Sequence, residues 1–365
     1  MKSFHIGITI VSLLLIVSAC DYKKDGNQVI DHEPGSSTTI IDDKGNELAD
    51  PGVSVDRIDK YENMEISAWL DEETVIVSKE NDSLDKMALL ELSEFYPRSL
   101  YRYNMNTKEY KLIKAKKDLF LGGATLSQDK KHLLYHETSQ GDPGFFVMNL
   151  DTLGDFGIRG EPTGAAVTAS WEGNEVLGTT YNNQVYTASP TGEISVLEDI
   201  KEESLFIIRK INDYLYYNTS FDETLTMLDL SSKEKKKLDL GAVYDVIPSP
   251  DESMMLVLQN NGTKFSIKLC EIDGSNQKII AEGTEIGGVS WSPDQRMIAY
   301  TMKDNSMVNG LNIHDMLTGE SYQIAVNIQN SVTNWSPSGD KLVYSEWNGE
   351  QYTSSVVYLS FSMQK

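Results

Sequence analysis

The stretch VSWSPD at 289–294 is followed by the apolar run MIAY at 297–300, and TNWSPSG at 333–339 is followed by LVY at 342–344. The aromatic residues that the two stretches share, Trp291 and Trp335, are 44 residues apart. Proline fixes the backbone φ at the second position of a turn, and a serine before it can hydrogen-bond to the turn backbone. Each stretch therefore predicts an apolar strand, a tight turn and a second apolar strand, repeated at a period of roughly 40 residues.

Weaker copies of the same pattern lie upstream. They share an apolar strand, a polar turn and a short run of Val, Ile, Leu, Met or Tyr, and they occur at 246–257, 207–217, 171–177, 125–135 and 69–77, which makes seven copies in all. A second marker, a strand that ends in a polar turn, falls between them six times, at steps of 45, 38, 42, 42 and 43 residues. Two interleaved markers with one shared period indicate the four-stranded blades of a β-propeller.

The last copy is incomplete, because the chain ends at Lys365 after a third apolar strand near 356–359. The segment GVSVDRI at 52–58 could supply the fourth strand, and this pairing would leave no open sheet edge between the first and last blades. We therefore expect an all-β fold in which residues 51–365 form a single propeller of four-stranded blades, closed by an N-terminal strand. Seven blades are expected, and six are the alternative if the weak copy near Ile208 is not a full blade.

The repeat resembles the TolB-like and WD40-like propellers, and less closely the propeller of prolyl oligopeptidases. The resemblance rests on the Trp-Ser-Pro-Asp turn followed by an aliphatic and aromatic strand; it spans about residues 60–361 and is strongest over 246–344. It implies a propeller architecture and brings no catalytic residues with it, because the shared motif is structural. TolB-like propellers usually have six blades, so seven would depart from that family.

The N-terminus has the pattern of an export signal. Lys2 precedes an apolar stretch at 6–19, which is shorter than the ~20 helical residues that span a bilayer but fits the apolar region of a signal peptide. The residues VSAC at 17–20 resemble the lipobox of bacterial lipoproteins, which implies removal of residues 1–19 and attachment of a lipid to Cys20. Residues 20–50 have few aromatic residues, and we expect them to form a flexible acidic tether.

A lipid on Cys20 would hold the protein in a bacterial cell membrane, facing the extracytoplasmic side. The chain has 32 Lys and Arg against 55 Asp and Glu, a formal net charge of −23. Binding to nucleic acid or to anionic lipid requires a cationic face, so this charge argues against both. The expected partners are the membrane, through the lipid, and another envelope protein.

Motifs for chemistry are sparse. His132 and His136 are four residues apart and would face the same way on a strand, so a metal pair is geometrically possible, although ordinary hydrogen-bonded histidines are favoured. We assign no catalytic residue, no metal ligand and no cofactor, and we expect Cys270, inside an apolar strand, to be a small buried residue. Metal ligands scattered singly over several blades, as in propeller lactonases, would leave no local pattern. A metal-dependent lactonase or hydrolase acting on a small extracellular substrate therefore stays the alternative.

The first repeat is longer than the others, since Trp69 and the equivalent Leu126 are 57 residues apart. The excess falls near 81–98, where apolar residues at 84, 87, 88 and 92 would form one face of a short helix capped by Ser83 or Asp82. This face either packs on the rim of its own propeller or presents an apolar patch to a partner. The patch would consist of Leu84, Met87, Leu92, Phe95 and Tyr96.

The leading functional expectation is a non-enzymatic protein-binding or scaffold module.

Overall fold

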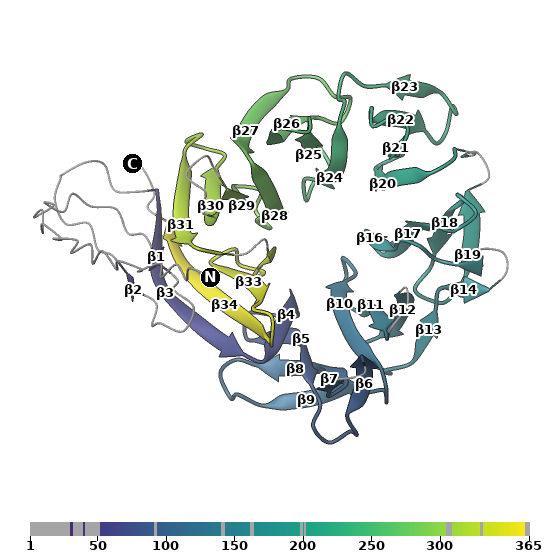
Figure 1. Cartoon of the computed structure of the whole chain (residues 1–365). Coiled ribbons are helices and arrows are strands. Elements are labelled where there is room, and N and C mark those ends of the chain that lie inside the picture. Colours follow the sequence, from purple (N-terminus) through teal and green to yellow (C-terminus); the bar gives the residue numbers. More distant parts are fainter. Residues whose placement is uncertain are drawn as a thin grey trace, which may run out of the picture.

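The computed structural model contains only β-strands as regular elements in the ranges that it describes, so the expected all-β fold is confirmed. Most strands belong to antiparallel sheets arranged around a common axis (Figure 1). Cys20 and most of the expected tether lie outside the described residues. The structure describes residues 30–31, 39–40, 52–90, 93–139, 143–160, 164–197, 200, 202–303, 309–328 and 331–361.

Four sheets contain four strands each in chain order, the first strand lying nearest the axis (Figure 1). The first of these sheets has β16 (Ser170–Glu172), β17 (Glu175–Thr179), β18 (Val185–Ala188) and β19 (Ile194–Leu197). The next has β20 (Leu205–Ile211), β21 (Tyr214–Thr219), β22 (Thr226–Asp229) and β23 (Lys235–Lys237). It is followed by β24 (Val243–Pro248), β25 (Met254–Asn260), β26 (Phe265–Glu271) and β27 (Lys278–Gly283). The fourth has β28 (Glu285–Trp291), β29 (Met297–Lys303), β30 (Asn309–Asp315) and β31 (Ser321–Val326).

An eight-stranded sheet precedes these four, and it consists of two four-stranded halves joined by the pairing of Phe120 with Arg98. One half has β4 (Met64–Trp69), β5 (Thr74–Glu80), β8 (Arg98–Asn104) and β9 (Tyr110–Lys114). The other has β10 (Phe120–Leu126), β11 (His132–Thr138), β12 (Gly144–Asn149) and β13 (Asp155–Gly157). Three short two-stranded sheets pair β1 (Ile30–Asp31) with β2 (Thr39–Ile40), β6 (Met87–Leu90) with β7 (Ser93–Phe95), and β14 (Arg159–Gly160) with β15 (Gly164–Ala165).

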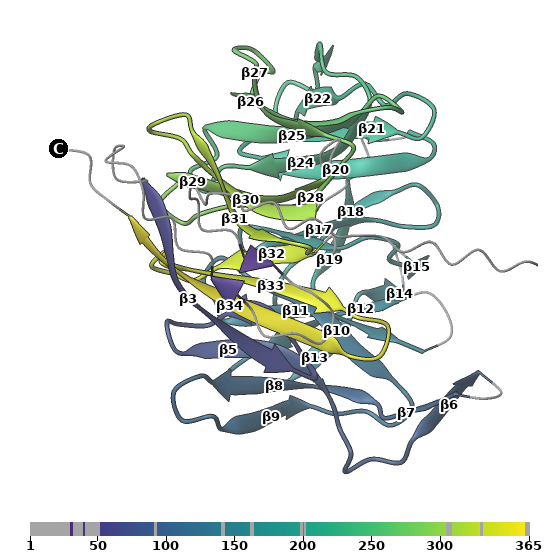
Figure 2. The same ribbon diagram turned by 60° about the vertical axis from the view of Figure 1, so that its left-hand side comes forward.

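The last sheet combines the two ends of the chain. Its order is β3 (Val53–Glu62), β34 (Tyr352–Phe361), β33 (Lys341–Trp347) and β32 (Val332–Trp335). β3 lies antiparallel along the whole of β34, from the pair Val53 and Phe361 to the pair Glu62 and Thr353 (Figure 2). The segment 52–58 thus lies beside the third strand of the last repeat.

The serine of each Ser-x-Asp turn forms the hydrogen bonds that the sequence led us to expect. In the turn after β28, Ser292 Oγ donates to Asp294 Oδ1 (2.6 Å) and accepts from the Met297 amide (2.8 Å). The turn after β24 repeats this arrangement, with Ser249 Oγ donating to Asp251 (2.8 Å) and accepting from the Met254 amide (3.0 Å). The serine therefore ties the start of the second strand to the end of the first.

Tryptophan side chains link neighbouring sheets. Four tryptophans lie at or next to the end of the first strand of a repeat. Each donates its indole Nε1 hydrogen to a backbone carbonyl of an inner strand in the adjacent sheet. The pairs are Trp171 to Thr125 (3.0 Å), Trp291 to Ile247 (3.4 Å), Trp335 to Ser290 (3.4 Å) and Trp69 to Asn334 (3.3 Å). The last pair joins the first repeat to the last.

The hydrophobic core is divided into seven buried clusters within the described residues. Six lie between neighbouring sheets, and one lies between the two halves of the eight-stranded sheet. One of them contains Trp69 and Val75 of the first repeat together with Val343 and Val356 of the last. Because apolar residues fill the spaces between sheets, each sheet is held by burial on both faces.

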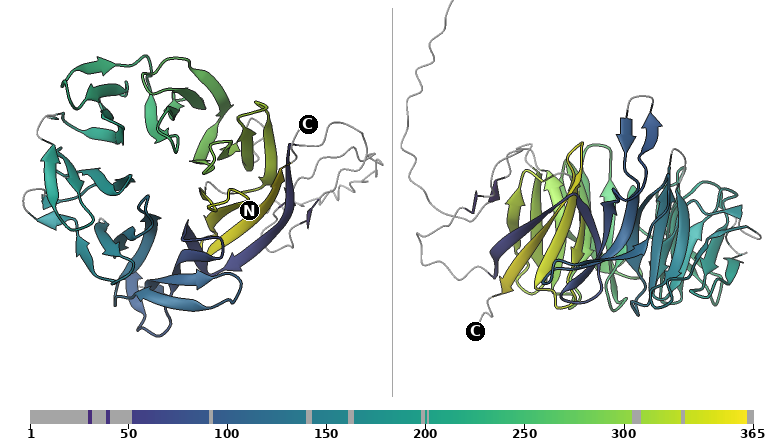
Figure 3. Two further views of the ribbon diagram at one scale, coloured as in Figure 1. Left: turned by 180° about the vertical axis from the view of Figure 1, so that it is seen from behind. Right: turned by 90° about the horizontal axis from the view of Figure 1, so that it is seen from below.

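The helix expected at 83–92 is not present: this insertion is the β6–β7 hairpin, which stands out from the body of the molecule (Figure 3). Its two ends are held side by side, because the Asn81 amide donates to the Pro97 carbonyl (2.8 Å). Ser83 does not cap a helix either, since its hydroxyl donates to Asn81 Oδ1 (2.5 Å). Because the insertion leaves the sheet and re-enters it at the same place, its two arms run antiparallel and can pair as strands. A short helix that buries little apolar surface would not be stable there.

Candidate functional site

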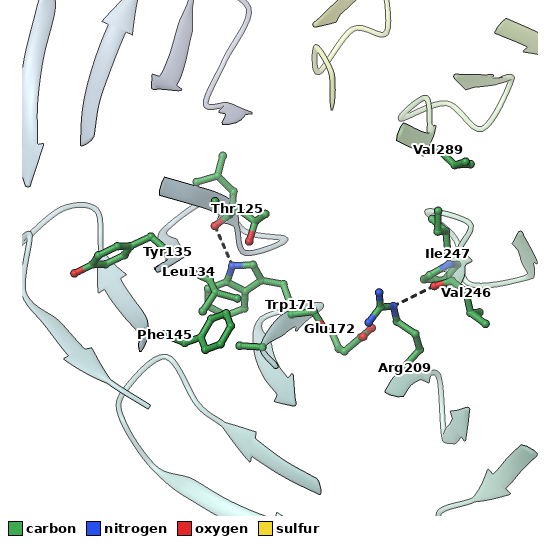
Figure 4. Close-up of a pocket in the computed structure, with 15 residues that line it drawn as sticks. Thr125, Leu134, Tyr135, Phe145, Trp171, Glu172, Arg209, Val246, Ile247 and Val289 are labelled. Carbon is green, nitrogen blue, oxygen red and sulfur yellow. Dashed lines mark hydrogen bonds between the residues drawn. The ribbon is translucent and has the colours of Figure 1, made fainter. Parts of the chain in front are cut away.

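A cavity of about 370 Å³ lies at the centre of the ring of sheets (Figure 4). It is bounded mainly by residues of the innermost strands β10, β16, β20, β24 and β28, and we call it the central cavity. Its polar side chains include Glu172 and Arg209, which face one another in Figure 4. Its apolar lining is formed by Leu126, Leu134, Phe145, Trp171, Val246, Ile247, Pro248 and Val289.

Glu172 is the last residue of β16, directly after Trp171, where clear copies of the repeat have serine. Its Oε1 atom is buried and has no hydrogen-bond partner among the described residues. Burial raises the pKa of this carboxyl to about 7, against the opposing effect of the nearby Arg209 guanidinium. A carboxyl that changes its charge near neutral pH inside a cavity marks a candidate functional site.

Arg209, on β20, is held rigidly across two sheets. Its Nε donates to the Val246 carbonyl (3.0 Å) and its Nη1 to the Ile208 carbonyl (3.0 Å). Its Nη2 donates to Asp245 Oδ1 (2.9 Å), and the amide of Val246 fixes the same oxygen (2.8 Å). A guanidinium has five N–H donors, so two remain for which the described residues offer no hydrogen bond.

Irregular inner strands shape the wall of the ring. The pairing of the first strand with the second shifts register within β4, β10, β20, β24 and β28. Such bulges increase the local twist and turn side chains in new directions. In β28 the bulge includes Gly288, which has φ +58°.

His132 and His136 both lie on β11, and their rings have different neighbours. His132 Nε2 is 3.3 Å from the side-chain nitrogen Nδ2 of Asn149, whereas the His136 ring lies against Gly122 and Gly123 of β10. Burial lowers the pKa of His136. Within the described part of the chain, no group of three or more His, Cys, Asp or Glu side chains is placed to hold a metal ion.

The hairpin carries the residues that we expected to form a partner patch. Met87 is buried, whereas Leu84, Phe95 and Tyr96 are partly exposed; Leu92 lies outside the described residues. The Lys86 ammonium lies 5.2 Å from the centre of the Tyr96 ring. The patch is thus smaller than the sequence suggested, because Met87 turns inward.

The hairpin is inserted between the second and third strands of its sheet, and the equivalent turns of other sheets carry exposed aromatic residues. Tyr181 (58% exposed), Phe221 (82%) and Trp347 (41%) lie at or beside such turns, and Phe206 (53%) lies at the start of an inner strand on the same side. Because the strands alternate in direction, all these positions lie on one face of the ring. We call it the hairpin face; the serine-containing turns lie on the opposite face.

Of the two cysteines, only Cys270 lies within the described residues. Cys270 is buried in β26, its thiol lies 3.9 Å from the Met255 carbonyl, and burial raises its pKa to about 12, as a small buried residue should behave. Cys20 lies outside the described residues. No helix long and apolar enough to cross a membrane occurs in the described part of the chain.

No protein-family model and no curated protein matches the chain. Among solved structures, an oligogalacturonate lyase in complex with manganese aligns with a TM-score of 0.61 at 12% identity, covering 83% of this chain and 91% of the lyase. The Cps50 (Swd1) β-propeller domain of Myceliophteria thermophila aligns with a TM-score of 0.57 at 12% identity, covering 84% of this chain and all of that domain. TolB of Acinetobacter baumannii aligns with a TM-score of 0.43 at 14% identity, covering 71% and 59%.

The likenesses to the lyase and to the Cps50 domain show the fold alone: the chain has a β-propeller fold. The aligned proteins include an enzyme and a propeller domain of a different kind, and function on a propeller depends on the site and not on the fold.

Proposed function

We propose that this protein is a membrane-anchored extracytoplasmic lipoprotein whose propeller is a non-enzymatic module that binds another envelope protein through the hairpin face. The observation that carries the proposal is the gathering of exposed aromatic side chains on the same face as the protruding β6–β7 hairpin. Aromatic residues are enriched at protein interfaces because they bury much apolar area for little side-chain entropy.

We further infer that the ring has seven blades and is closed by β3. Two observations support this: the hydrogen bond from Trp69 to Asn334, and the buried cluster that contains Trp69 and Val343. Each joins the first repeat to the last. With β3 paired along β34, the last sheet has four strands, as do the four regular sheets and each half of the eight-stranded sheet.

Removing residues 83–96 and joining the ends through two glycines should abolish capture of the partner while the propeller still folds. The ends can be joined because Asn81 and Pro97 are hydrogen-bonded neighbours. Partner capture is measured by cross-linking in the native cell, and folding by a cooperative thermal transition. The control is Leu317→Ser, which removes an exposed apolar side chain (77% exposed) from a turn on the opposite face. If the shortened protein is captured as well as this control, the hairpin does not bind the partner.

Cys20→Ala should move the protein from the membrane fraction to the soluble fraction, because the lipid would be its only hold on the bilayer. The control is Cys270→Ala, which removes the other cysteine, buried in β26; this variant should remain membrane-bound. The measurement is cell fractionation in detergent-free buffer. A Cys20→Ala protein that stays in the membrane fraction would refute the anchor.

A further inference from the structure

We propose that the central cavity binds a small amphipathic carboxylate, whose carboxylate group is held by Arg209 and Glu172 and whose apolar body lies against Trp171. This site is separate from the hairpin face, and the inference does not rest on protein binding there.

The polar end of the cavity offers hydrogen-bond donors. Arg209 has only donors, two of them without a bond to the described residues. Glu172, protonated below about pH 7, adds an O–H donor, and its Oε1 has no partner. A ligand group complementary to donors alone must be rich in acceptors, and a carboxylate binds a guanidinium through two parallel hydrogen bonds.

The charge of the site favours a monoanion. Arg209 supplies one positive charge, which Asp245 at 2.9 Å already balances in part. A second full negative charge on the ligand would therefore be left without compensation in a partly desolvated site. A carboxylate beside Glu172 also favours its protonated form, so ligand binding and proton uptake should be coupled.

The charged groups around Glu172 agree with this coupling. Arg209 on the neighbouring sheet lowers the pKa of Glu172, whereas Glu252, in the turn after β24, raises it, and the backbone amide of Lys210 contributes a hydrogen bond that lowers it. Burial outweighs them all. The carboxyl is thus neutral in the absence of ligand at mildly acidic pH.

The remainder of the cavity is apolar. Trp171, Phe145 and Ile247 present ring and aliphatic surface beside the polar end (Figure 4). The volume of about 370 Å³ accommodates a ligand of about a dozen non-hydrogen atoms. A small acid with one aromatic ring meets both the polar and the apolar requirement.

The test uses the full chain and two probes of the same shape, 3-phenylpropionate and the neutral 3-phenylpropanamide, in isothermal titration calorimetry. We expect the carboxylate to bind at least about tenfold more tightly than the amide, in keeping with charge-assisted hydrogen bonds. Wild-type affinity should fall about tenfold between pH 6 and pH 8, because the protonated fraction of a group with a pKa of about 7 falls by that factor.

Three variants make the result decisive. Arg209→Gln should weaken binding of 3-phenylpropionate at least about tenfold. Glu172→Gln should bind it equally at both pH values, since the amide always has a donor; this variant keeps the test meaningful even if Arg209→Gln unfolds. Arg57→Gln, an exposed change on β3, should bind like the wild type. Failure of 3-phenylpropionate to bind at millimolar concentration, or binding that neither cavity variant alters, would overturn the proposal.

Discussion

Replacing Glu172 with glutamine is expected to raise the free energy of unfolding by about 3 kcal/mol near pH 8 and to leave it almost unchanged near pH 4. Burial raises the pKa of this carboxyl from 4.5 to about 7, and one pKa unit corresponds to about 1.4 kcal/mol. The folded state holds the proton more tightly than the unfolded state. Wild-type stability therefore falls as the pH rises from about 4.5 to about 7, whereas glutamine, which resembles the protonated carboxyl, does not titrate.

The measurement is urea-induced unfolding of both proteins across this pH range. Glu350→Gln, at an exposed turn, serves as the control for the removal of one carboxylate charge. A constant difference between Glu172→Gln and the wild type at all pH values would show that the carboxyl is not strained by burial. A gain in stability on removing a side chain is typical of residues kept for binding and not for folding.

Gly288→Ala is expected to lower the free energy of unfolding by about 2 to 5 kcal/mol. Its φ of +58° costs an L-residue about 1 to 2 kcal/mol, and an added Cβ would stand 2.0 Å from the Ser331 carbonyl oxygen in the next sheet. Relieving such an overlap means moving two sheets apart, which adds a cost of about 1 to 3 kcal/mol. The carbonyl of Gly288 also accepts a hydrogen bond from Thr333, which that movement would break.

Gly262→Ala separates the two causes. Gly262 also has a positive φ, +86°, but its added Cβ would meet nothing within 4 Å. This control should lose only the conformational part, about 1 to 2 kcal/mol. Equal losses in the two variants, measured by urea denaturation, would mean that the sheets do not pack as closely at Gly288 as the structure indicates.

The fold was readable from the sequence because its signals are local and repeated. A turn such as Ser292-Pro293-Asp294 needs only its own residues and the first amide of the next strand, so the same letters recur wherever the same turn is built. The pairing of β3 with β34 could also be anticipated, because residues 52–58 have the alternating pattern of a strand and the last repeat shows only three apolar strands. The prediction of a helix within 81–98 is wrong: the spacing of the apolar residues suits a helix, whereas the hydrogen bond between Asn81 and Pro97 favours a hairpin.

The central cavity could not be predicted in this way. Glu172 and Arg209 belong to different, weak copies of the repeat, and they come together only where the sheet that contains β16 packs against the sheet that contains β20. The available signal was a departure from the repeat pattern. Glu172 stands where clear copies of the repeat have serine, and Arg209 is a charged residue in an inner strand rich in isoleucine. The exposed aromatic residues are equally scattered in sequence, since the turns that carry them belong to separate sheets.

The course of β3 has a mechanical consequence. It begins at Val53, beside Phe361 on the face that carries the serine turns, and ends at Glu62, towards the hairpin face. A tensile force between the N-terminal segment and a partner on the hairpin face would run along the axis of this strand. Antiparallel hydrogen bonds lie perpendicular to the strands, so such a pull would shear the whole ladder between β3 and β34 at once instead of unzipping it bond by bond. β3 is therefore oriented to resist a pull along its own axis with all of its hydrogen bonds to β34 together.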